Sequence, residues 1–90
     1  MDFKYEKNRI YLENEKGERT AEVTFPEISK DSVNINHTYV SPSLRGQGVA
    51  DKLVRELALH LRKNKIKAIS TCSYAVDWFE NNPEFDDVCK

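Results

Sequence analysis

Residues 33–51 read VNINHTYVSPSLRGQGVAD, and this stretch predicts a strand, a glycine loop and a helix start, in that order. Val33, Ile35 and Tyr39 alternate with polar residues up to Pro42, where the strand must end because proline has no amide to donate. Two glycines follow, and from residue 49 the apolar spacing changes from two to about 3.6 residues, the period of a helix. Amides that precede a helix lack intrahelical partners and lie at its positive end, so the loop is suited to bind a phosphate.

The loop lacks the features of two common nucleotide-binding motifs. It contains no Gly-Lys-Ser/Thr, which excludes a Walker-type loop. Asp51 stands where a Gly-x-Gly-x-x-Gly dinucleotide loop needs its third glycine or an alanine, and no strand-helix-strand unit with a ribose-binding acid follows. A turn whose glycines serve geometry alone is the alternative to an anion-binding loop.

Length and composition limit the possible functions. Ninety residues predict a single domain, residues 1–90, with one hydrophobic core. The 14 basic and 15 acidic residues give no electrostatic signature of a nucleic-acid or membrane partner, and no apolar stretch predicts a signal or membrane span. We therefore expect a cytoplasmic protein with Cys72 and Cys89 reduced. The histidines and cysteines have no metal-ligand spacing, so no metal site is predicted.

Three strands are predicted before the central stretch. Alternating residues indicate strands at 3–6, 9–13 and 20–25, with the first two joined by a turn near 7–8. Ala21, Val23 and Phe25 should face inward, and the proline after them closes the third strand. A polar connection over 27–31 then leads to the fourth strand.

A helix, a strand and a second helix are predicted after the loop. The helix at 48–63 carries one apolar stripe, the fifth strand spans 66–72, and the short helix spans 74–81. The stripe contains Ala50, Leu53, Val54, Leu57, Ala58 and Leu61. Because a helix joins the fourth and fifth strands, these two should be parallel. The predicted class is α/β (α+β), with a mixed, mostly antiparallel sheet, a parallel pair joined by a crossover helix and a short C-terminal helix.

Two segments resemble the GNAT acyltransferase superfamily. Residues 45–50, RGQGVA, resemble its Arg/Gln-x-x-Gly-x-Gly/Ala signature, which likewise follows a Val-x-Pro strand end. Residues 75–85, AVDWFENNPEF, resemble its Ala-x-x-Phe-Tyr-x-x-x-Gly-Phe segment. The short chain, the His-Thr pair at 37–38 and Thr-Cys-x-Tyr at 71–74 resemble the compact subgroup of short GNAT-like N-acetyltransferase domain proteins.

The resemblance implies an acetyl-CoA-dependent N-acetyltransferase whose acceptor is an amine, such as a lysine on a protein or peptide. It implies that the loop binds the pyrophosphate of coenzyme A, that the second helix flanks the coenzyme, and that main-chain groups of the fourth strand follow the acyl and pantetheine arm. The coenzyme-binding residues expected from it are Tyr39, Val40, Arg45, Gly46, Gln47, Gly48, Val49, Ala50, Trp78 and Phe79. We expect the protein to be a monomer.

The sequence departs from the family pattern in two ways. Phe79 stands where many members carry the tyrosine that protonates the leaving coenzyme thiolate. The predicted elements also lack the N-terminal helices that normally help to enclose the acceptor. Two hypotheses follow: an acetyltransferase with a bulky acceptor on an open face, or a coenzyme-A-binding or interaction module with little turnover.

Three residues are candidates for catalysis. Cys72 ends the fifth strand just before a helix start, where the dipole favours a nucleophilic thiolate; the alternative is a small buried hydrophobe. His37 shares its predicted strand face with apolar residues, which favours a core histidine over a general base. Tyr74 can replace the missing tyrosine as proton donor or can pack as an ordinary aromatic residue. Cys89 is expected to be an exposed thiol near the chain end.

Overall fold

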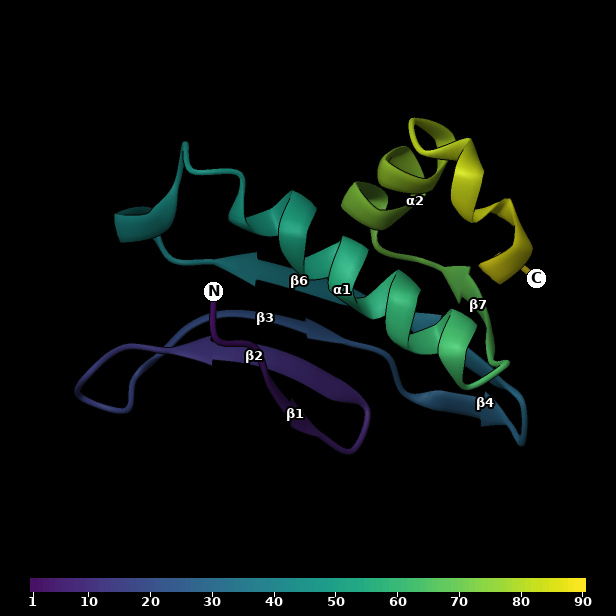
Figure 1. Cartoon of the computed structure of the whole chain (residues 1–90), viewed down its shortest axis with the longest axis horizontal. Helices are drawn as coiled ribbons and strands as arrows, with labels where there is room; N and C mark the ends of the chain where they lie inside the picture. Colours follow the sequence, from purple (N-terminus) through teal and green to yellow (C-terminus); the bar gives the residue numbers. More distant parts are fainter.

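Seven strands in two sheets lie against one long helix in the computed structural model, which describes residues 1–90 (Figure 1). The strands are β1 (Lys4–Glu6), β2 (Arg9–Glu13), β3 (Arg19–Thr24), β4 (Glu27–Ser29), β5 (Ser32–Ile35), β6 (His37–Val40) and β7 (Lys67–Ser70). The helices are α1 (Val49–Lys63) and α2 (Ser73–Glu80), with short 3-10 helices η1 (Pro42–Leu44) and η2 (Pro83–Val88). The antiparallel sheet has the order β1-β2-β3-β6, and the other has the order β4-β5-β7. Its β5–β7 pair is parallel, which confirms the predicted class and the crossover through α1.

The chain from β3 to β6 forms one long, bent hairpin. The predicted polar connection over 27–31 is wrong, because β4 continues from β3 beyond Phe25 and Pro26 and pairs with β5. Backbone bonds from Asn34 N–H to the Pro26 carbonyl (2.9 Å) and from Asn36 N–H to the Thr24 carbonyl (3.2 Å) join the two sheets. The sheets therefore meet along a continuous hairpin rather than at a domain-like boundary.

A β-bulge at Asn36 bends this hairpin. Thr24 pairs with His37, and Glu27 pairs with Val33. Between these pairs, two residues on one side, 25–26, oppose three on the other, 34–36. The extra residue leaves two consecutive side chains, those of Asn36 and His37, exposed. The predicted core position of His37 is therefore wrong: its side chain is 54% exposed, because one inserted residue moves all later side chains to the opposite face.

Helix α1 packs its predicted stripe against the sheets. Leu53, Val54, Leu57, Ala58 and Leu61 are completely buried, whereas Ala50 is half-buried and Val49 takes a core position at the helix start. The predicted inward residues of β3 and its continuation, Ala21, Val23 and Phe25, are also buried. These side chains belong to one apolar cluster beneath the helix. Neither helix is long and apolar enough to cross a membrane.

The C-terminal residues pack against the core. Phe85 and Val88 of η2 are buried, and Cys89 forms a β-bridge with Ala68 of β7. The prediction of an exposed Cys89 thiol is therefore wrong, because the side chain is half-buried beside the core. Burial, together with the nearby carboxylates of Asp86 and Asp87, raises the pKa of this thiol.

Arg62 of α1 forms several hydrogen bonds with η2. Its guanidinium donates to both carboxylate oxygens of Asp87, at 2.9 and 2.8 Å, and to the backbone carbonyl of Glu84 at 2.7 Å. It also lies 4.5 Å from the centre of the Phe85 ring. The hydrogen bonds from Arg62 hold the pKa of Asp87 below its ordinary value.

We expect Arg62→Met to lower the melting temperature more at pH 7 than at pH 3. Because the folded-state pKa of Asp87 is depressed, its pairing stabilises the protein fully above the unfolded pKa of about 3.9. That stabilisation is lost as the pH falls through the lower folded-state value. Thermal melts at both pH values measure the difference, with Lys63→Met, a neighbour that makes no ion pair, as control. An equal loss at both pH values would contradict this account.

Candidate active site

A pocket of about 250 Å³ lies at the start of α1, between the glycine loop, strand β6 and helix α2. It is lined by Val40, Leu44, Arg45, Gly46, Gly48, Val49, Ala50, Asp51 and Tyr74. The structure thus brings together six of the predicted coenzyme-binding residues and one predicted catalytic residue. Gln47 is not among them; its side-chain amide donates to the Ser43 carbonyl at 3.5 Å.

The glycine loop presents bare backbone to this pocket. Gly46 (φ 82°) and Gly48 (φ 71°) both lie in the left-handed region, and a Cβ added at either would meet no atom within 4 Å. The glycines are therefore required by backbone conformation and leave open space above the loop. The first helical N–H bond is from Lys52 to the Gly48 carbonyl, so the amides of residues 49–51 have no intrahelical partner.

Strand β6 has one open edge, because β7 pairs with β5 and not with β6. The Ser41 amide donates to the Thr20 carbonyl at 2.7 Å. In an antiparallel ladder every second residue of a strand forms backbone hydrogen bonds with a given neighbouring strand, here β3. The main chain of Tyr39 is therefore engaged by β3, and its side chain is exposed on the outer face. The main-chain groups of Thr38 and Val40 point to the open edge. Of the two residues predicted to follow the pantetheine arm, Val40 is the one with free main-chain groups.

Cys72 lies at the N-cap of α2, directly after β7. Its Sγ is 3.5 Å from the hydroxyl of Thr38 across the gap between the strands. Burial alone would raise the pKa of this thiol, but the Thr38 hydroxyl, followed by the nearby backbone amides of Ala75, Tyr74 and Thr38, outweighs it and lowers the pKa. The thiol is thus partly exposed at a helix start and also packs against the edge of the core.

Tyr74 and Cys72 both lie at the start of α2, beside the pocket. Tyr74 lines the pocket in the first turn of α2. Burial, followed by the nearby carboxylate of Asp51, raises the pKa of the Tyr74 phenol, which keeps it protonated at neutral pH. Val40 in the pocket and Thr38 beside Cys72 are two residues apart on one strand face, or about 7 Å. A ligand that extends from the pocket along β6 therefore leads to the thiol.

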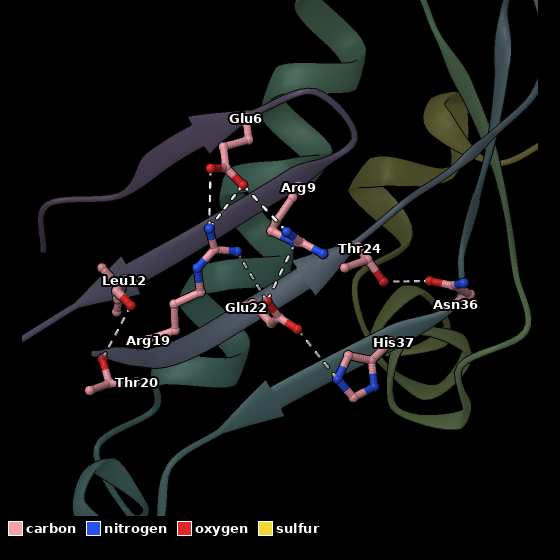
Figure 2. Close-up of polar contacts among 9 residues, drawn as sticks. All are labelled: Glu6, Arg9, Leu12, Arg19, Thr20, Glu22, Thr24, Asn36 and His37. Atoms are coloured by element: carbon pink, nitrogen blue, oxygen red, sulfur yellow. Dashed lines mark hydrogen bonds and ion pairs between the residues drawn. The ribbon is translucent and has the colours of Figure 1, made fainter. Parts of the chain in front are cut away.

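His37 lies on the other side of the sheet from this pocket. Figure 2 shows its imidazole beside Glu22 of β3, with Nε2 3.8 Å from the carboxylate, which two arginines also approach. Thr38, the next residue, is inward-facing and contacts Cys72, so adjacent side chains project to opposite faces. The structure does not bring His37 and Cys72 together on one face.

Trp78 and Phe79 lie in the core rather than in the pocket. Trp78 is 5% exposed and Phe79 is also buried, with the two rings packed edge to face at 5.0 Å. Neither lines the pocket, whereas Asp51, which is not among the predicted site residues, does. Asp51 accepts a 2.7 Å hydrogen bond from the Trp78 indole N–H. Only the spacing between two helices reveals that contact, and sequence periodicity contains no such information.

Comparison with known proteins identifies the family. A family model described as GCN5-related N-acetyl-transferase matches residues 9–88. The solution structure of a protein from Staphylococcus aureus, described as a GCN5-like N-acetyltransferase, is 34% identical and superimposes with a TM-score of 0.82. That match covers 99% of this chain and 87% of the S. aureus protein. No curated protein sequence matches the chain.

More distant structures share the fold. The Escherichia coli GNAT protein YhbS in complex with CoA is 20% identical, with a TM-score of 0.60 over 69% of this chain and 38% of its own. The E. coli ribosomal-protein-S18-alanine N-acetyltransferase is 17% identical, with a TM-score of 0.64 over 81% of this chain and 49% of its own. At these identities the likeness concerns the fold alone. The family match across residues 9–88 and the close S. aureus structure show that the chain belongs to the GCN5-related N-acetyltransferase family.

Proposed function

We propose that the chain is an acetyl-CoA-dependent N-acetyltransferase that moves an acetyl group to an amine. The observation that supports this most strongly is the pocket in which the glycine loop, the open edge of β6 and Tyr74 converge. It offers an anion site at one end and leads to a thiol at the other. YhbS, which shares this fold, has CoA bound, which agrees with the same ligand class here.

Each part of the coenzyme has a matching group in this pocket. The free amides of residues 49–51 suit the two phosphates. The guanidinium of Arg45 can add charge-assisted hydrogen bonds to them. The free main chain of Val40 suits the amides of the pantetheine arm, which would add to β6 as a further strand does. The acetyl thioester then lies near Cys72.

Transfer proceeds in two steps in this proposal. The Cys72 thiolate attacks the thioester carbonyl, the carbon–sulfur bond to the coenzyme breaks, and Tyr74 gives its proton to the departing coenzyme thiolate. A neutral acceptor amine then attacks the acetyl-cysteine, the thiolate of Cys72 leaves, and the amine proton returns to the Tyr74 phenolate. The lowered pKa of Cys72 favours the thiolate that the first step needs, and the raised pKa of Tyr74 means that its phenol carries the proton at neutral pH.

The acceptor proposed here is a lysine on a protein or peptide. Charged and polar side chains of β3 and β6 lie on the sheet face opposite α1, and His37 is exposed there (Figure 2). An open face of this kind admits a bulky acceptor, because no helix encloses it.

A titration with acetyl-CoA tests the binding part of the proposal. We expect shifts in the amide resonances of Val40 and residues 46–51, and none in the distant turn at 14–17. Assays with peptide amines should then show release of the coenzyme thiol that depends on the acceptor. Binding without such release would support a coenzyme-A-binding module instead, and no shift at millimolar ligand would remove the basis of both readings.

A further inference from the structure

Asp51 places a negative charge in a pocket that is otherwise suited to an anion. Asp51 lies in the first turn of α1 and is one of the residues that line the pocket, and its side chain is 50% exposed. The nearest cation is Arg55, whose guanidinium is 3.8 Å from one carboxylate oxygen of Asp51 and only partly offsets the negative charge. An acid at this point opposes a bound pyrophosphate, so its presence calls for a separate reason.

The hydrogen bond to Trp78 supplies that reason. The Trp78 indole N–H is almost completely buried, and the Asp51 carboxylate is its hydrogen-bond acceptor at 2.7 Å. This is the side-chain hydrogen bond that joins α1 to α2. A buried indole N–H that loses its acceptor pays a desolvation penalty, so the contact fixes where α2 lies relative to α1.

The position of α2 in turn determines the surroundings of Cys72. Helix α2 has eight residues, and its buried side chains, Ala75, Trp78 and Phe79, form one face. Cys72 is the N-cap residue of α2, so its thiol lies directly at the start of this helix. Trp78 lies one turn further along the same face as Ala75. A shift of α2 at Trp78 would therefore move the helix start at which the Cys72 thiol lies, and with it the contact between this thiol and the Thr38 hydroxyl.

We propose that Asp51 is a positioning residue that holds α2, and with it Cys72, against the anion loop, while it weakens coenzyme affinity. The part that concerns affinity rests on the proposed coenzyme-binding function. The part that concerns Cys72 does not, because it can be measured on the thiol without any ligand. The two parts are separable, since the charge of Asp51 affects the first and its hydrogen bond affects the second.

Two substitutions separate the charge from the hydrogen bond. Asp51→Asn removes the charge but keeps an oxygen that accepts the indole N–H, whereas Trp78→Phe keeps the charge and removes the N–H. Asp51→Ala removes both. Asp77→Asn is the matched control, because Asp77 is an exposed acid on α2 that does not line the pocket. The readouts are coenzyme A affinity by calorimetry at fixed salt and the rate of Cys72 alkylation at pH 7 in a Cys89→Ser background.

We expect Asp51→Asn to bind coenzyme A at least about threefold more tightly and to be alkylated within about twofold of the wild-type rate. Trp78→Phe and Asp51→Ala should be alkylated at least about threefold more slowly, and Trp78→Phe should bind coenzyme no more tightly. Asp77→Asn should change neither value.

An unchanged coenzyme A affinity in Asp51→Asn would overturn the proposed charge effect. A wild-type rate of Cys72 alkylation in Asp51→Ala would overturn the positioning role, and this test remains available if Trp78→Phe does not fold. If the wild type binds no coenzyme A, the proposed function and the affinity part fail together, and the alkylation rates still decide the positioning role.

Discussion

Cys72→Ala is expected to reduce acceptor-dependent acetyl transfer at least about 100-fold while coenzyme binding stays within about threefold. The thiol is the nucleophile in the proposed first step, and it lies beyond the pocket proposed for the phosphates rather than in the lining of that pocket. Loss of the side chain therefore removes chemistry and not the binding site. Steady-state rates with a peptide amine, together with calorimetry for coenzyme A, measure the two quantities separately.

Three further measurements test the covalent route. Cys72→Ser should be nearly as inactive as the alanine variant, because a hydroxyl is not ionised at neutral pH. Mass spectrometry of the wild type with acetyl-CoA should show one acetyl group on the Cys72 peptide. Cys89→Ala is the matched control: its thiol is half-buried with a raised pKa, so its loss should leave the rate unchanged.

The pH dependence provides an independent check on Cys72. The Thr38 hydroxyl and the backbone amides at the start of α2 lower the pKa of this thiol. The alkylation rate should therefore rise with pH and reach its plateau at a lower pH than for an ordinary cysteine, whose pKa is about 8.5. Bound coenzyme A should slow the alkylation. If Cys72→Ala keeps most of its transfer rate, transfer to the amine is direct, and His37 on the open face becomes the residue to substitute.

The strand, loop and helix around the glycines could be predicted from sequence because local signals agree there. Pro42 ends the strand, positive φ at Gly46 and Gly48 matches the glycine positions, and the apolar period changes at the residue where α1 begins. The parallel pairing of β5 and β7 followed from the intervening helix. Features set by periodicity or by backbone stereochemistry depend on residues that are close together in the sequence. They can therefore be recognised in a single sequence.

Features that depend on one residue or on tertiary contacts were missed. A bulge at Asn36 leaves the composition of the strand unchanged but reverses the face of every later side chain, which is why the position of His37 was wrong. Trp78 was expected among the coenzyme-binding residues but occupies the core. The Asp51–Trp78 contact joins residues 27 positions apart. Only the packing of α2 against α1 determines these last two outcomes.

Gly48→Val is expected to weaken coenzyme A binding at least tenfold, which corresponds to about 1.4 kcal/mol. Gly48 is the N-cap of α1 and lines the pocket, and the space beyond its missing Cβ is open in the structure. A branched side chain there would occupy the space through which the pyrophosphate reaches the free amides. Calorimetry with coenzyme A measures the loss of affinity directly.

Backbone strain must be separated from this steric effect, and Gly17→Val is the matched control. Gly17 has φ 79° against 71° for Gly48, and a Cβ at either position meets no atom within 4 Å. Both variants should therefore lose a similar stability of about 1–2 kcal/mol from the left-handed conformation. Only Gly48→Val should lose affinity, because Gly17 lies in the turn before β3, away from the pocket. Equal coenzyme affinity in the two folded variants would show that the glycine loop is a turn and not an anion site.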